Sequence, residues 1–148
     1  MNKRIFLFVF LIAALVLSAC GEKSALAEHR DQWKAQNINH YRFELTISCF
    51  CPFFEVNPVT VEVLDGKIVS MSGADGKALS DPFRSTFEEA GTVEALFDLA
   101  GEYFKSADKI EVTYDAEYGF PVSIVVDQIE LAMDDEITYR VENFTRLP

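Results

Sequence analysis

The feature that most constrains this fold is a two-residue alternation of apolar and polar side chains. From Tyr41 to Ile47 every second residue is apolar, and charged or hydroxyl residues fill the positions between them. Residues two apart in a strand point to the same face of a sheet, so this alternation predicts a half-buried β-strand. The apolar positions continue through Cys49 and Cys51, and we expect the strand to end at Pro52, which favours an extended conformation at Cys51.

Five further segments show the same period of two. They lie at residues 59–63, 67–71, 110–114, 120–126 and 137–141. Asp65-Gly66 separates the first two of them and predicts a tight hairpin, because both central positions of that turn need a positive φ. Short turns join antiparallel neighbours, so we expect about six antiparallel strands.

Three other segments have helical features. Ser24 is expected to cap a helix that runs to about Gln36, with Trp33 as its core contact. Pro82 opens a short helix, and the clearest helix is predicted from about Thr92 to Ala107. Its apolar stripe consists of Val93, Leu96, Phe97, Ala100 and Phe104. The predicted fold class is α+β, with an α-βββ-α-βββ order and helices packed on one face of the sheet.

The first nineteen residues have the parts of a secretory leader. A positive start at Lys3 and Arg4 precedes an uninterrupted apolar stretch. The run 5–19 covers fifteen residues, which is short of the roughly 20 that span a bilayer as a helix. Leu17-Ser18-Ala19-Cys20 resembles the lipobox of bacterial lipoproteins. We therefore expect a signal peptide at 1–19, a lipidated tether at 20–24 that carries acyl chains on Cys20, and one α+β domain at 25–148.

The expected location is the cell membrane or the outer membrane, with the domain facing the periplasm or the exterior. Several acyl chains give stable anchoring, so the membrane itself is one expected partner. The net charge is −11, and removal of the leader would make it about −13. Such an acidic chain would repel nucleic acid phosphates, so no nucleic acid is expected and an envelope protein is the expected second partner.

Cys49 and Cys51 are the least ordinary pair in the chain. An oxidising compartment favours a disulfide between them, although residues two apart in a regular strand have Cα atoms about 7 Å apart, at the limit for an unstrained bridge. Three alternatives remain open. The pair can be two buried thiols, a soft-metal site completed by His29 or His40, or a redox exchange site.

The remaining sequence contains no catalytic motif such as a serine elbow, a phosphate loop or a zinc-hydrolase pair. Acidic residues gather at 115–117 and 127–136; we expect solvated turns at opposite ends of antiparallel strands, with a weak calcium site as the alternative. The leading hypothesis is a non-enzymatic binding or scaffold domain without a cofactor or resident metal. The alternative is a thiol redox or soft-metal-binding envelope protein that uses Cys49 and Cys51.

A set of short motifs occurs along the mature domain. They are Tyr41-Arg42-Phe43, Cys49-Phe50-Cys51-Pro52, Asp65-Gly66-Lys67 with Val69, Tyr114-Asp115 to Tyr118-Gly119-Phe120-Pro121, and Asp134-Asp135-Glu136 to Tyr139. From about Trp33 to Phe144 the chain resembles an uncharacterised bacterial lipoprotein family, the domain of unknown function 6174. That family has no assigned activity, so the resemblance implies the lipoprotein nature and the fold alone.

The leader generates a direct prediction. Mass spectrometry of the mature protein should find a chain that begins at an acylated Cys20, and Cys20→Ser should abolish both the acylation and the membrane attachment. An unmodified chain that begins elsewhere, or one that keeps Met1, would contradict the prediction.

Overall fold

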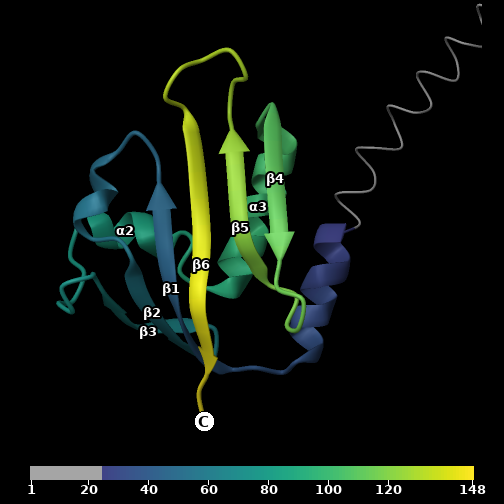
Figure 1. Ribbon diagram of the computed structural model, residues 1–148. Coiled ribbons are helices and arrows are strands. Elements are labelled where there is room, and N and C mark those ends of the chain that lie inside the picture. Colours follow the sequence, from purple (N-terminus) through teal and green to yellow (C-terminus); the bar gives the residue numbers. More distant parts are fainter. Residues whose placement is uncertain (1–24) are drawn as a thin grey trace, which may run out of the picture.

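The fold is one antiparallel sheet of six strands, in the order β3-β2-β1-β6-β5-β4 (Figure 1). The computed structural model describes residues 25–148. The strands are β1 (His40–Ser48), β2 (Val59–Leu64), β3 (Lys67–Ser72), β4 (Lys109–Tyr114), β5 (Pro121–Asp127) and β6 (Glu136–Arg146). The first three strands form one meander and the last three form another, and β1 pairs with β6 between them.

The helices cover one face of this sheet. Residues 25–35 are helical before β1, and a 3-10 turn, η1 (Pro52–Glu55), lies between β1 and β2. The helices α2 (Phe83–Glu88) and α3 (Val93–Ser106) connect the edge strand β3 to the opposite edge strand β4. The predicted α+β class with six antiparallel strands is therefore confirmed. None of the helices in the described residues is long and apolar enough to cross a membrane.

The core lies between the sheet and the helices. Alternation along β1 places Tyr41, Phe43, Leu45 and Ile47 in the core, where each is at most 4% exposed. The predicted stripe of α3 faces them, and its buried members are Val93, Leu96, Phe97 and Ala100. Thr92 caps α3 by accepting a hydrogen bond from the Ala95 N–H at 3.0 Å, as its position before the apolar stripe suggests.

The last strand is longer than its alternation predicts. The period of two ends at Val141, but β6 continues to Arg146. Its pairing with β1 contains a bulge, because Glu44 pairs with Glu142 whereas Arg42 pairs with Thr145. Asn143 is the extra residue and has a left-handed φ of 53°. This bulge returns Phe144 to the core face, where its ring packs 5.9 Å from that of Trp33.

The first helix docks on the turn that joins β4 to β5. Its His29 ring stacks on Tyr114 with centroids 3.9 Å apart, and the Gln32 side chain donates to the Glu117 carbonyl at 3.2 Å. Gly119 permits this contact, since a Cβ atom there would lie 2.9 Å from the Gln32 side chain and from the His29 carbonyl oxygen. Gly119 also has a φ of +84°, which disfavours any other residue.

Two glycine substitutions separate these two effects. Gly119→Ala should lower the free energy of unfolding by roughly 2–4 kcal/mol, because backbone strain adds to a steric clash. Gly66→Ala is the matched control: Gly66 has a φ of +73°, but a Cβ atom there meets nothing within 4 Å. The control should lose only about 1 kcal/mol in urea unfolding. Equal losses in the two variants would contradict the docking argument.

Candidate functional site

Two loops leave the sheet at the same end. Residues 49–58 connect β1 to β2, and residues 128–135 connect β5 to β6. Because β6 pairs antiparallel with β1, the end of β1 and the start of β6 are neighbours, with Ser48 opposite Thr138. Figure 1 shows both loops at this end. We call these two segments together the loop end.

The loop end exposes large apolar side chains. Phe50 and Phe54 are 83% and 78% exposed in the first loop, and Leu131 and Met133 are 94% and 89% exposed in the second. The other large exposed apolar side chains among residues 25–148 reach at most 59%, at Ile129. Isolated apolar residues are common on protein surfaces, whereas a group of this size on two neighbouring loops is typical of an interaction site.

Carboxylates hold the second loop in place. Asp135 accepts a hydrogen bond from the Ile129 N–H at 2.7 Å, and Asp108 accepts one from the Glu130 N–H at 3.1 Å. At the base of the loop, burial raises the pKa of the Asp127 carboxyl, and the nearby Asp135 and Glu136 raise it further. The apolar side chains are thus presented from a loop that is both anchored and negatively charged.

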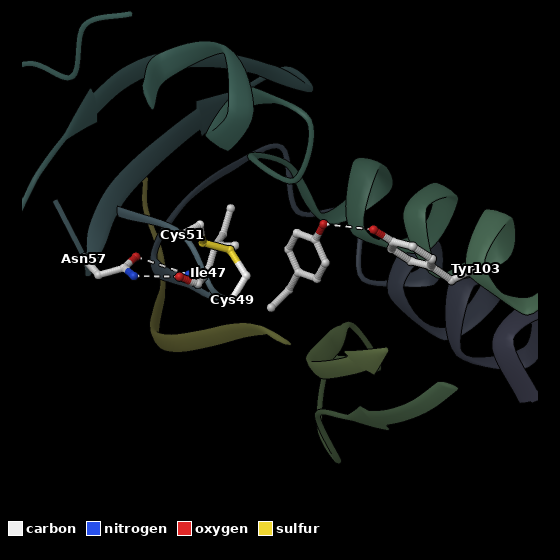
Figure 2. The surroundings of a disulfide bond; sticks show 6 residues. Ile47, Cys49, Cys51, Asn57 and Tyr103 are labelled. Carbon is white, nitrogen blue, oxygen red and sulfur yellow. Dashed lines mark hydrogen bonds between the residues drawn. A yellow bond between two sulfur atoms is a disulfide. The ribbon is translucent and has the colours of Figure 1, made fainter. Parts of the chain in front are cut away.

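The cysteine pair lies in the first loop, outside β1. The prediction that β1 continues to Pro52 is wrong, because the strand ends at Ser48. The Cys51 N–H donates to the Cys49 carbonyl at 2.8 Å, so the chain turns at Phe50. This turn brings the two Cα atoms to 5.1 Å, and the structure joins the sulfur atoms in a disulfide (Figure 2). By the chain-entropy account a ring this small stabilises a fold by at most about 1.6 kcal/mol.

A different residue closes the first loop. The Asn57 amide donates to the Ile47 carbonyl at 2.7 Å and accepts from the Ile47 N–H at 3.2 Å, as Figure 2 shows. These two hydrogen bonds join the last core residue of β1 to the end of the loop. The N–H groups of Val56 and Asn57 also donate to the Phe53 carbonyl, at 3.1 and 3.0 Å. Side-chain and main-chain hydrogen bonds therefore maintain the loop independently of the disulfide.

A hydroxyl pair, also drawn in Figure 2, joins α3 to the sheet near this end. The Tyr103 and Tyr139 oxygens are 3.2 Å apart, and Tyr139 lies opposite Ile47 in the β1–β6 register. Burial raises the pKa of the Tyr139 hydroxyl, and the hydrogen bond with Tyr103 raises it further. The Tyr139 hydroxyl is therefore neutral near pH 7 and acts here as a hydrogen-bonding partner.

The histidines do not join the cysteine pair. His40 begins β1, so it lies roughly 26 Å from the end of that strand. Its Nε2 is 2.9 Å from the Glu62 carboxylate, and this hydrogen bond raises the pKa of the imidazole. His29 stacks on Tyr114 in the first helix. Within residues 25–148, no group of three or more potential ligand side chains is placed to hold a metal ion.

The acidic turns lie apart, as expected. The turn 115–119 precedes β5 and the loop 128–135 follows it, so β5 separates them. Cys20, the expected lipidation site, lies outside the described residues. The exposed apolar side chains of the loop end were missed by the sequence reasoning, which treated 127–136 only as an acidic loop. A sequence pattern does indicate these exposed side chains. Ile129, Leu131 and Met133 alternate with polar or small residues, in a segment that is too acidic for a core strand.

The Asn57 hydrogen bonds generate a stability prediction. Asn57→Ala should lower the free energy of unfolding by roughly 2 kcal/mol, because two half-buried main-chain groups lose their partner. Asn39→Ala is the control, since the Asn39 amide bonds only the exposed Asp65 carboxylate. Urea titrations that give equal midpoints for the two variants would show that Asn57 does not hold the loop.

The comparisons with known proteins agree with the motif-based resemblance. No curated protein and no solved structure matches the chain. Residues 25–146, which include both loops of the loop end, match the model of a family of unknown function (DUF6174), and the chain belongs to that family.

Proposed function

We propose that this chain is a lipid-anchored protein of the bacterial envelope whose loop end binds another envelope protein without catalysing a reaction. The observation that carries the proposal is the exposure of Phe50, Phe54, Leu131 and Met133 on two neighbouring loops. Burying side chains of this size contributes roughly 1.5–3 kcal/mol each. Four of them contribute roughly 6–12 kcal/mol, which is comparable with the cost of association, so polar and charged contacts around them have to supply the net affinity.

The shape of the surface favours a protein over a small molecule. Four hollows among residues 25–148 have volumes of about 140 to 360 Å³; only one of these exceeds 300 Å³, and all four are open to solvent. Ligand pockets usually hold 300–1,000 Å³ and enclose most of the ligand. Projecting apolar side chains instead fit into a partner's pockets.

The charge of the loop end defines the partner's chemistry. Glu130 lies between Ile129 and Leu131, and Asp134, Asp135 and Glu136 follow Met133. A matching surface has apolar pockets with Lys or Arg at the rim, because acidic groups at an interface exclude acidic neighbours. The same charges repel nucleic acid.

The position of the first helix favours a partner close to the membrane. Ala25 lines a hollow together with Phe104 and residues of β4 from Ile110 to its last residue, Tyr114. The tether of residues 20–24 spans at most roughly 17 Å when extended. A lipid on Cys20 would therefore keep the start of the first helix, and with it the domain, close to the membrane surface.

The test is site-specific crosslinking in cells, with a photoreactive residue at position 131 and, as the matched control, at Val69. Val69 is 53% exposed on the edge strand β3, outside the loop end. We expect a single adduct from position 131 and none from position 69. The partner in that adduct should have a surface with a basic rim. Once that partner is purified, Leu131→Ser with Met133→Ser should raise the Kd at least tenfold, because the apolar contact is lost.

Val69→Ser should leave the Kd unchanged, and 0.5 M salt should weaken binding because charge complementarity contributes to it. Three outcomes would overturn the binding proposal. They are equal adduct yields from positions 131 and 69, a partner surface that is acidic, and a Kd that is unchanged in the double variant. Cys20→Ser should release the protein from the membrane while leaving the Kd intact. The anchor and the binding surface are thus tested separately.

A further inference from the structure

The apolar alternation of β1 continues beyond the end of the strand. Cys49 and Cys51 have the same parity as Ile47, yet the strand ends at Ser48. The β1–β6 register places Ser48 opposite Thr138, so continued pairing would bring Cys49 opposite Ile137 and Phe50 opposite Glu136. The strand β6 begins at Glu136 and runs past the end of β1 (Figure 1). The β1 side of residues 136–137 therefore has no strand partner.

The bridged turn prevents this extension. The Cys51 N–H is directed to the Cys49 carbonyl, and the disulfide fixes the two residues around Phe50. In an unbridged chain the same segment satisfies the strand pattern, with both thiols on the core face and Phe50 on the solvated face. New main-chain hydrogen bonds to β6 would then offset the loss of the bridge.

Opening the bridge does not open the loop. Asn57 bonds both main-chain groups of Ile47, and the Ala74 N–H donates to the Val56 carbonyl at 3.1 Å. None of these contacts involves a sulfur atom. The bridge therefore has a small structural role, which is typical of a bond that exchanges rather than one that holds a fold.

The two cysteines differ in their surroundings. Both cysteines are half-buried, but Cys49 packs against the core, whereas Cys51 is outside those core contacts and directly precedes η1. Phe50 directly precedes Cys51 and Phe54 follows it three residues later, and both rings are strongly exposed. An incoming protein thiol can contact these rings while it approaches the Cys51 sulfur. Glu55 is the single charged residue of loop 49–58, so no cation of that loop stabilises a thiolate there.

We propose that Cys49–Cys51 is a thiol–disulfide exchange site that accepts two electrons from a protein dithiol of the thioredoxin type, and that the reduced segment extends β1 along β6. A thiolate of the donor attacks the Cys51 sulfur; the bond to Cys49 breaks, and the Cys49 thiolate takes up a proton. The second donor thiolate then attacks the donor sulfur of the mixed disulfide and releases Cys51, which is protonated. The donor leaves as a disulfide, so two electrons and two protons are transferred.

The experiment uses the purified chain with whichever N-terminus it carries, so its result does not depend on the proposed anchor or partner. The oxidised protein is mixed with reduced thioredoxin or with dithiothreitol, quenched with an alkylating reagent and weighed intact. We expect two alkylated thiols and a melting temperature within about 5 °C of that of the oxidised protein. Hydrogen exchange should slow at least tenfold at one or more amides of residues 136–138 and stay unchanged in β4.

Variants separate recognition from chemistry. Phe50→Ser with Phe54→Ser should slow reduction by thioredoxin at least tenfold and leave the rate with dithiothreitol within twofold. Val69→Ser should change neither rate. The exchange proposal is overturned if the chain stays more than 95% oxidised at a 100:1 ratio of reduced to oxidised thioredoxin. It is also overturned by a melting temperature that falls more than 10 °C on reduction, or by two free thiols that hold stoichiometric copper or zinc in the isolated protein. Reduction without slower exchange at residues 136–138 would overturn the strand extension.

Discussion

The packing around Tyr41 joins the parts of this fold that lie far apart in the chain. Its ring lies on the core face of the central strand β1 and meets Trp33 of the first helix edge-on, with centroids 5.4 Å apart. Its hydroxyl accepts a hydrogen bond from the Val93 N–H at the start of α3, at 3.1 Å. Burial raises the pKa of this hydroxyl to about 12, so it stays neutral as an acceptor. The Tyr41 side chain thus connects the central strand β1 to both the first helix and α3.

That arrangement leaves the loop end as the part of the domain with surplus apolar surface. Beyond Ile47 and Tyr139, Phe53 of the first loop still packs against Phe83 and Phe87 of α2, with ring centroids 6.2 and 5.5 Å apart. The exposed apolar side chains of both loops lie outside these contacts. Acidic groups lie beside the exposed apolar side chains of the second loop, which makes the loop end suitable for a partner that is both basic and apolar. Loops with fixed bases and exposed tips are the usual location of binding residues, because the scaffold supplies their positions.

The proposed binding and exchange activities meet at Phe50. In the bridged chain the turn between Cys49 and Cys51 directs this ring outward at the loop end. If β1 extends along β6, strand geometry places the same ring on the solvated face of the sheet. The redox state of one bond would then change the apolar surface that a partner meets. Two arrangements of one short segment are enough for this coupling.

The sequence by itself determined the secondary structure and the fold class. Alternation and helical periodicity are local properties, and they predicted β1 to β5, α2 and α3 with small errors at the ends. Asp65-Gly66 predicted a hairpin for the same reason, and both residues have the positive φ that the turn requires, 50° and 73°. The cysteine pair of the candidate site was also found from the sequence, because its residue types and spacing are unusual.

Tertiary structure decided the rest. The bulge at Asn143 shifts the period by one residue, so the last third of β6 could not be read from alternation. The strand β1 ends at Ser48 because the chain turns between Cys49 and Cys51, although the apolar alternation of the sequence continues through both cysteines. Above all, pairing of β1 with β6 brings the loops 49–58 and 128–135 together across most of the chain length. Which strands become neighbours depends on how all the apolar faces bury one another, and no local period contains that information.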